Sequence, residues 1–504
     1  MIHTTRLFAL IALAACGDNL PPPTPVPPNP PPPAPTRSIT GTATLVTTDP
    51  AGDSATAEIG LHDTLVSAHF PHGTTWDVHP GISDAHGHFS IDDVPEGAYW
   101  LELYDVPSGN RQLLWTDASS LAFEEHTTGR PDAVPASTNT ALTFGPMPGL
   151  DPVQADDGLQ LTSGNLGLIV NLFGALAPAT TSLDYTRAWT GEPLISGAAH
   201  DDVTLVQLRN ATDASGIPYL SPITSVTFDA IEQIDHATTH VIGTFAPPPD
   251  LAYDLHWDRP AFVAASVDGN PARIGPAAGQ NFLFRAMPGG AQYGGSPFAA
   301  VVLGLDGTLF GDASELEHEF AIKNPYPASW LFNDFQMAFP ITVPVPGVPD
   351  QSIELPAVMQ LTTTELPTHD HPIEPLVSAP RAPTIDGRDL FADQEGVGLT
   401  PTIAWTAPAV GTPDAYVLTV EHWELQFAFA DVGEIATLIV PGNVTSVRLP
   451  DHVLEAGEHY LIRIASLAQP GVDVRTRSLY TLGLPYGYAD LISNTFSAVT
   501  PNPE

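Results

Sequence analysis

Cysteine is almost missing from this chain, because Cys16 is the only one among 504 residues. A single thiol forms no disulfide within the chain, so the fold depends on its hydrophobic cores alone. Apolar residues make up 43% of the sequence, which is enough to build such cores. The composition therefore excludes a disulfide scaffold and a dithiol redox protein.

Basic residues are also scarce, with 16 lysines and arginines against 57 acidic residues and a net charge of −41. Lys323 is the only lysine. A surface this acidic repels phosphate groups, so we expect no nucleic acid partner. It also disfavours electrostatic adhesion to anionic lipid headgroups.

Catalytic signatures are missing as well. The sequence has no Gly-x-Ser-x-Gly elbow, and His318-Glu319 lacks the second histidine of a zinc protease helix. Asp312, Glu315, Glu317 and Glu319 lie close in sequence and offer a carboxylate pair for glycoside hydrolysis. Because acids are dense throughout, we keep a secreted glycoside hydrolase only as the alternative and expect no catalytic residues and no cofactor.

The amino-terminal stretch has the three zones of an export signal. Arg6 supplies a positive start, the apolar run from Leu7 to Ala12 follows, and small residues precede Cys16. The run is far too short to cross a bilayer, which needs about 20 apolar residues.

Leu13-Ala14-Ala15-Cys16 resembles a bacterial lipobox, so residues 1–16 resemble a lipoprotein signal peptide. The resemblance implies cleavage before Cys16 and lipidation of its thiol, which would hold the chain on a membrane. Gly17 and Asp18 follow, and they favour the outer membrane or the cell surface over the inner membrane.

Proline is the most frequent residue of the next stretch and recurs throughout the rest of the chain. Eleven of the fifteen residues from Pro21 to Pro35 are proline, and such a run adopts polyproline II. We read residues 17–37 as a semi-rigid linker. The total of 54 prolines and 41 glycines disfavours helices. We therefore predict an all-β protein with several β-sandwich domains in a string.

Residues 38–136 are predicted to form the first domain. Asp84 to Gly87 is a turn, Phe89 and Ile91 point to one face of a strand, and Tyr99 begins the next inward row. This pattern resembles the carboxypeptidase regulatory-like family, a transthyretin-type β-sandwich. The resemblance implies an accessory module without peptidase activity, with Phe89 and Tyr99 in its core.

Histidines are frequent in this first domain. His86 and His88 flank a turn, and His69, His72 and His79 precede them. Imidazole suits zinc or copper, but a site needs three or four converging ligands. Only two of these histidines are close in sequence, so we assign no metal ligand and read them as exposed loop residues.

Residues 138–375 are β-rich and form one large sandwich or two small ones. The predicted strands span 141–144, 203–208, 226–230, 240–245, 261–267, 298–305, 335–345 and 353–361. Ser314 to Glu317 has capping-box spacing and predicts a short helix that ends before Pro325. The loop from Asn324 to Trp330 has two interpretations. Either Trp330 is buried in the core, or the loop exposes its aromatic rings as a binding surface for a sugar or a partner.

Residues 376–384 are a proline-containing linker, and residues 385–500 form the last predicted domain. Trp405 ends one strand, and Leu454 precedes Tyr460 at a short spacing. This arrangement is similar to a fibronectin type III domain or an immunoglobulin-like relative. The likeness implies that Trp405 packs between two sheets and that the Tyr460 hydroxyl reaches backbone near Leu454.

Together these features predict a lipid-anchored envelope or cell-surface protein. Its expected activity is binding, adhesion or scaffolding, with a carbohydrate or protein ligand and no catalysis. The membrane is expected as a partner through the lipid on Cys16.

Overall fold

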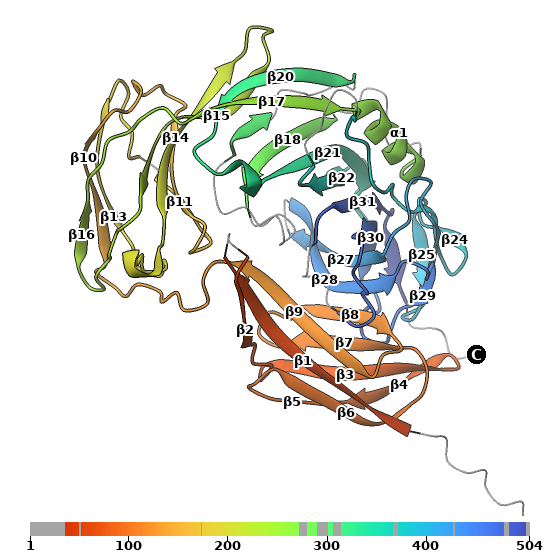
Figure 1. The fold of residues 1–504 in the computed structure, drawn as a ribbon. Helices are drawn as coiled ribbons and strands as arrows, with labels where there is room; N and C mark the ends of the chain where they lie inside the picture. Colours follow the sequence, from red (N-terminus) through yellow and green to blue (C-terminus); the bar gives the residue numbers. More distant parts are fainter. Residues whose placement is uncertain are drawn as a thin grey trace, which may run out of the picture. The chain divides into compact units, whose positions relative to one another are not determined.

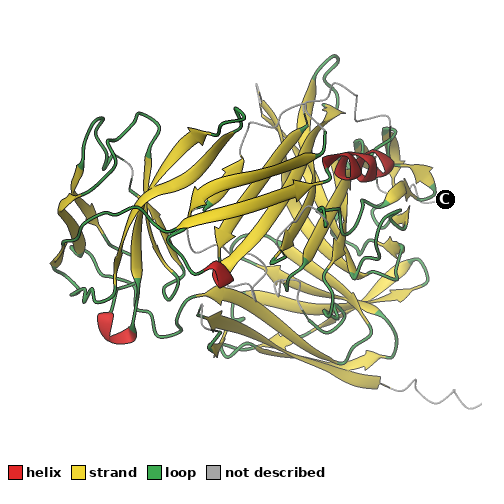
Figure 2. Ribbon diagram, turned by 45° about the horizontal axis from the view of Figure 1, so that its top comes forward, coloured by secondary structure: helices red, strands yellow, loops and turns green. Residues whose placement is uncertain are grey.

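Strands dominate the chain, as Figures 1 and 2 show, and the prediction of an all-β fold is confirmed. The computed structural model describes residues 36–49, 52–172, 174–271, 280–289, 301–305, 314–365, 371–426, 429–477 and 483–499. Cys16, the predicted signal peptide and most of the predicted proline-rich linker lie outside this part. Within it, no helix combines the length and apolar character needed to cross a membrane.

The first sandwich, residues 36–128, pairs two small sheets. Its strands are β1 (Thr36–Thr48), β2 (Ser54–Glu58), β3 (Thr64–His72), β4 (Thr75–Pro80), β5 (Ile82–Ser83), β6 (His88–Pro95), β7 (Tyr99–Asp105), β8 (Arg111–Thr116) and β9 (Ser120–Thr128). One sheet has the order β2-β1-β6-β5, with β9 parallel to β1, and β4, β3, β7 and β8 are neighbours in the other. Phe89, Ile91, Tyr99 and Leu101 meet in the core between them.

The second sandwich, residues 135–246, has a separate core around the fully buried Trp189. Its elements are β10 (Ala141–Pro148), β11 (Gly158–Ser163), β12 (Leu168–Asn171), β13 (Ser182–Ala188), the 3₁₀ turn η1 (Gly197–Ala199), β14 (Val203–Thr212), β15 (Pro218–Phe228) and β16 (Thr238–Val241). β13, β10 and β16 form one layer, and β12, β11, β14 and β15 form the other.

The third segment, residues 250–373, contains the one α-helix of the described residues. Its elements are β17 (Asp250–Trp257), α1 (Arg259–Gly269), β18 (Asn281–Pro288), β19 (Leu303–Leu305), β20 (Leu316–Lys323), the 3₁₀ turn η2 (Ala328–Trp330), β21 (Leu331–Pro344) and β22 (Ser352–Thr363). Trp257 sits at its centre, edge-on to Phe262, Phe282 and Phe335 at 5.3–5.6 Å between ring centroids.

Two predicted elements in this segment are wrong. The span 261–267 is predicted as a strand but belongs to α1. Asp258 caps this helix by accepting the Ala261 N–H at 2.9 Å, and Pro260 lies in its first turn, where proline favours a helix start. The predicted helix after Ser314 is instead β20. Its Leu316, Phe320 and Ile322 are buried in two-residue steps against β17, which outweighs a capping-box spacing.

The C-terminal sandwich, residues 381–499, is an immunoglobulin-like pair of sheets. Its strands are β23 (Arg381–Ile385), β24 (Arg388–Asp389), β25 (Gln394–Val397), β26 (Thr402–Thr406), β27 (Ala415–Gln426), β28 (Phe429–Pro441), β29 (Ser446–Arg448), β30 (His459–Ala468), β31 (Tyr486–Ile492) and β32 (Phe496–Ala498). β23, β26 and β29 form one sheet, and β28, β27, β30 and β31 form the facing one, which is the strand order of fibronectin type III domains.

Backbone ladders cross the predicted domain limits. β8 of the first sandwich runs parallel to β28, and β22 of the third segment pairs with β31. The chain from Thr36 onward is accordingly one compact unit. The domain boundaries themselves stay a prediction.

Two tryptophans join the first sandwich to the C-terminal sandwich. The Trp76 indole donates to Leu449 O at 3.1 Å, and the Trp100 indole donates to Arg448 O at 3.0 Å. Arg448 in turn stacks over Trp76 at 4.4 Å. Trp100 is fully buried, on the face of β7 opposite Tyr99.

We predict that Trp100→Ala lowers the free energy of unfolding by about 3–5 kcal/mol, because it removes a buried indole and leaves a cavity. Urea unfolding followed by circular dichroism measures the change. Leu65→Ala is the control, since Leu65 is 61% exposed, and it should change stability by less than about 0.5 kcal/mol. Equal effects of the two substitutions would contradict the packing described here.

Candidate functional site

The predicted structural residues are all buried. Phe89 and Tyr99 lie in the first core, where the Tyr99 hydroxyl donates to Ala118 O at 2.6 Å. Trp405 packs edge-on against Tyr416 at 5.1 Å. The Tyr460 hydroxyl accepts the Glu455 N–H at 2.8 Å, one residue beyond the buried Leu454. These residues pack within the sheets of their sandwiches.

The acids of the hydrolase alternative do not form a pocket pair among the residues described. Glu317 and Glu319 are exposed on the outer face of β20, and Glu315 lies 2.6 Å from His256 Nε2. Asp312 and the predicted turn at Asp306-Gly307 lie outside the described residues.

The aromatic loop from Asn324 to Trp330 forms one wall of a pocket of about 400 Å³. Trp330 is half-buried, partly packed on the core and partly facing the pocket. Tyr326 is 8% exposed, and its hydroxyl lies 3.1 Å from Thr162 Oγ1. The Trp330 ring therefore both anchors the loop and lines a cavity, and its contact with a sugar or a partner stays a prediction.

The opposite wall is polar and comes from the second sandwich. It is formed by Thr162, Ser163, Gly164, Asn165, Asp202, Thr204 and Thr227. Asn165 donates to His200 O at 2.7 Å, which fixes its amide. The Ser163 hydroxyl is buried and has no hydrogen-bond partner among the described residues. A buried hydroxyl without a partner is costly, so the pocket has unmet hydrogen-bonding capacity.

The charge in this pocket belongs to Asp202. Burial raises the pKa of its carboxyl, and the neighbouring Asp229 and Asp201 charges raise it further, although His200 opposes them. Asp201 itself points away into a buried pair, with Arg130 Nε 2.9 Å from its Oδ1 and the Ser196 N–H donating to Oδ2 at 2.8 Å. This pair holds the loop that presents Asp202.

A second cluster joins residues that the sequence pattern did not connect. His86 lies 2.8 Å from Glu58 and His88 lies 3.3 Å from Asp84, all exposed, so this predicted histidine pair is split between two carboxylates. The structure instead places His69 and His452 on the same buried carboxylate, Glu102.

Glu102 is 5% exposed and remains ionised. Burial alone would raise its pKa, but hydrogen bonds from His452 and His69 and the nearby Arg111 guanidinium more than offset it and lower the pKa. The sequence signal for this cluster was weak, because His452 and Glu102 are 350 positions apart.

Comparisons with known proteins do not identify the chain. No family model matches it, and no curated protein matches it. One solved structure, the FN1-FN3 domains of chicken CNTN1, is aligned over 92% of this chain and 98% of that chain, at 8% identity and a TM-score of 0.14. A score this low carries no argument about the fold, so the assignment of the C-terminal sandwich rests on its own strand order.

We predict that Asp201→Ala destabilises the protein by about 3–5 kcal/mol, because it leaves Arg130 partly buried without its main partner. The control is Asp132→Ala, which removes the other carboxylate on Arg130. Asp132 is 77% exposed, so its loss should cost less than about 1 kcal/mol. Thermal unfolding of both variants measures the difference, and a larger loss for Asp132→Ala would contradict the assignment.

Proposed function

We propose that this chain is a lipid-anchored binding protein of the cell envelope whose ligand is a carbohydrate held in the Trp330 pocket. The observation that carries the proposal is the pairing of one aromatic wall with one polar wall. Trp330 and Tyr326 line a pocket of about 400 Å³ together with Asp202, Asn165 and Ser163. The Ser163 hydroxyl has no hydrogen-bond partner among the residues that the structure describes.

Sugars have the matching two-sided chemistry. The C–H face of a pyranose packs on an aromatic ring, and its hydroxyls bond to carboxylate, amide and hydroxyl groups. Pockets of about 300–1,000 Å³ with a few fixed polar groups are typical of small-ligand sites. The pocket therefore fits one or two sugar residues.

Anchoring is the second half of the proposal. The lipobox-like stretch ending at Cys16 and the prolines that follow it support a lipidated chain raised on a spacer at the outer membrane or cell surface. The resemblance of the first domain to carboxypeptidase regulatory-like modules also supports a non-catalytic accessory role. Intact mass measurement of the protein from its native membranes tests the anchor, and an unmodified Cys16 would reject it.

Trp330→Ala should weaken carbohydrate binding by about 10-fold or more, because it removes the stacking surface. A glycan array with the wild-type protein selects the sugar, and titration calorimetry compares the variants. Trp115→Ala is the matched control, since Trp115 is a half-buried tryptophan of the first sandwich. Binding unaffected by Trp330→Ala, or no glycan bound, would reject the proposal.

Binding should also weaken as the pH falls. Asp202 accepts hydrogen bonds only when ionised, and because its pKa is raised, affinity should begin to fall at a pH above the usual aspartate value of about 3.9. Asp202→Asn should flatten this pH dependence while keeping one acceptor oxygen. Titration from pH 7 to pH 4 measures it. An unchanged profile in Asp202→Asn would show that another group is responsible.

A further inference from the structure

Three residues of ligand type converge beside a second pocket. His69 lies on β3, Glu102 on β7, and His452 in the loop that follows β29. One nitrogen or oxygen atom from each lies within 4.8 Å of the other two. The first two residues face the C-terminal sandwich from adjacent strands, and the third comes from that sandwich.

The separations suit a small ion. His69 Nε2 lies 2.9 Å from Glu102 Oε2, and His452 Nε2 lies 3.1 and 3.2 Å from the two carboxylate oxygens. Ligands on a tetrahedral zinc with bonds of about 2.0–2.1 Å are about 3.3 Å apart. An ion between these atoms would need shifts of only a few tenths of an ångström at these two contacts.

The Glu102 carboxylate is held in place by neighbouring side chains, as the carboxylate ligands of metal sites usually are. Arg111 Nη1 donates to Glu102 Oε1 at 2.5 Å, and the Ser67 hydroxyl donates to Glu102 Oε2 at 3.2 Å. Arg111 is itself fixed over the Tyr104 ring at 4.2 Å. Such partners orient a carboxylate toward a metal, and each carboxylate oxygen can still accept a further ligand bond.

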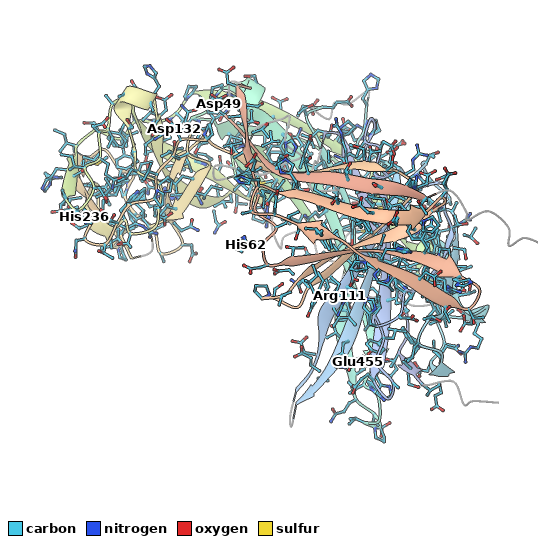
Figure 3. The ribbon with its side chains drawn as sticks, turned by 90° about the horizontal axis from the view of Figure 1, so that it is seen from below. Asp49, His62, Arg111, Asp132, His236 and Glu455 are labelled. Carbon is cyan, nitrogen blue, oxygen red and sulfur yellow. The ribbon has the colours of Figure 1, made fainter. Side chains whose placement is uncertain are left out.

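One side of the cluster is open. His452 lies on the wall of a pocket of about 360 Å³, which Arg111, His422, Glu455 and Glu458 also line (Arg111 and Glu455 are labelled in Figure 3). His422 lies 3.1 Å from Glu458. Glu102, Glu455 and Glu458 together outnumber the single arginine, so the local charge favours a cation. The open side leaves room for water as a fourth ligand.

The backbone at His452 is strained to reach this position. Its φ is +68°, a left-handed conformation that residues with a side chain adopt at some cost. Strain of this kind persists where the surrounding structure fixes it, and it clusters at ligand sites.

We propose that His69, Glu102 and His452 bind one Zn²⁺, with the fourth position open to the pocket. Two nitrogen ligands and one carboxylate are a donor set that zinc accepts. The ion would tie the first sandwich to the C-terminal sandwich. His69 Nδ1 is buried without a hydrogen-bond partner among the described residues, so the affinity should fall below that of a site with a complete outer shell.

The test uses the whole chain, stripped with a chelator and titrated with ZnCl₂ alone. Wild-type protein should bind one equivalent, and His452→Ala should weaken binding by about 100-fold or more. Two controls should keep wild-type affinity: His422→Ala, in the same pocket, and His86→Ala, at the exposed histidine pair. His452 is the ligand to replace because it is half-exposed, whereas loss of His69 or Glu102 threatens folding.

A spectroscopic measurement supports the assignment independently of affinity. Co²⁺ in place of Zn²⁺ should give the visible absorption of a four-coordinate N₂O₂ site in the wild type and lose it in His452→Ala. Equal zinc binding by the wild type and His452→Ala, or no binding by the wild type, would overturn the proposal. Carbohydrate binding at Trp330 should be unchanged by the chelator, so the two proposals fail separately.

Discussion

Both faces of β7 are buried, and much of the structure depends on this constraint. Tyr99 and Leu101 face the core of the first sandwich, while Trp100 and Glu102 face the C-terminal sandwich. A strand covered on both sides cannot leave a carboxylate unpaired, so Glu102 requires its histidine and arginine partners. The same contact brings together segments far apart in sequence and creates the pocket beside His452.

Several arginines form similar buried pairs. Arg130 meets Asp201, Arg209 meets Asp157 and Arg463 meets Asp490, and each of these carboxylates is at most 1% exposed. These pairs use three of the 16 basic residues, and the 57 acidic residues far outnumber all of them. A chain with a net charge of −41 can therefore bury some of its carboxylates as ion pairs and keep the others in solvent.

The two proposed sites share an origin, since each lies where two parts of the chain meet. The Trp330 pocket joins the second sandwich to the loop before β21, and the zinc cluster joins the first sandwich to the C-terminal one. Polar side chains at such junctions are only partly satisfied by their own sheets. Within the described part of the chain, Ser163 and His69 each keep one buried atom without a hydrogen-bond partner.

The sequence by itself determined the all-β class and the inward rows of Phe89 and Tyr99, because these follow from local two-residue alternation and turns. The packing roles of Trp405 and Tyr460 were implied only by the likeness to fibronectin type III domains. The sequence pattern predicted a strand where α1 lies and a helix where β20 lies. In both places the local pattern is compatible with either structure, and packing against β17 and the aromatic core determines which one forms. Only the tertiary structure could place Trp100, Glu102 and His452 together, because pairing across 350 residues leaves no periodic signal in the chain.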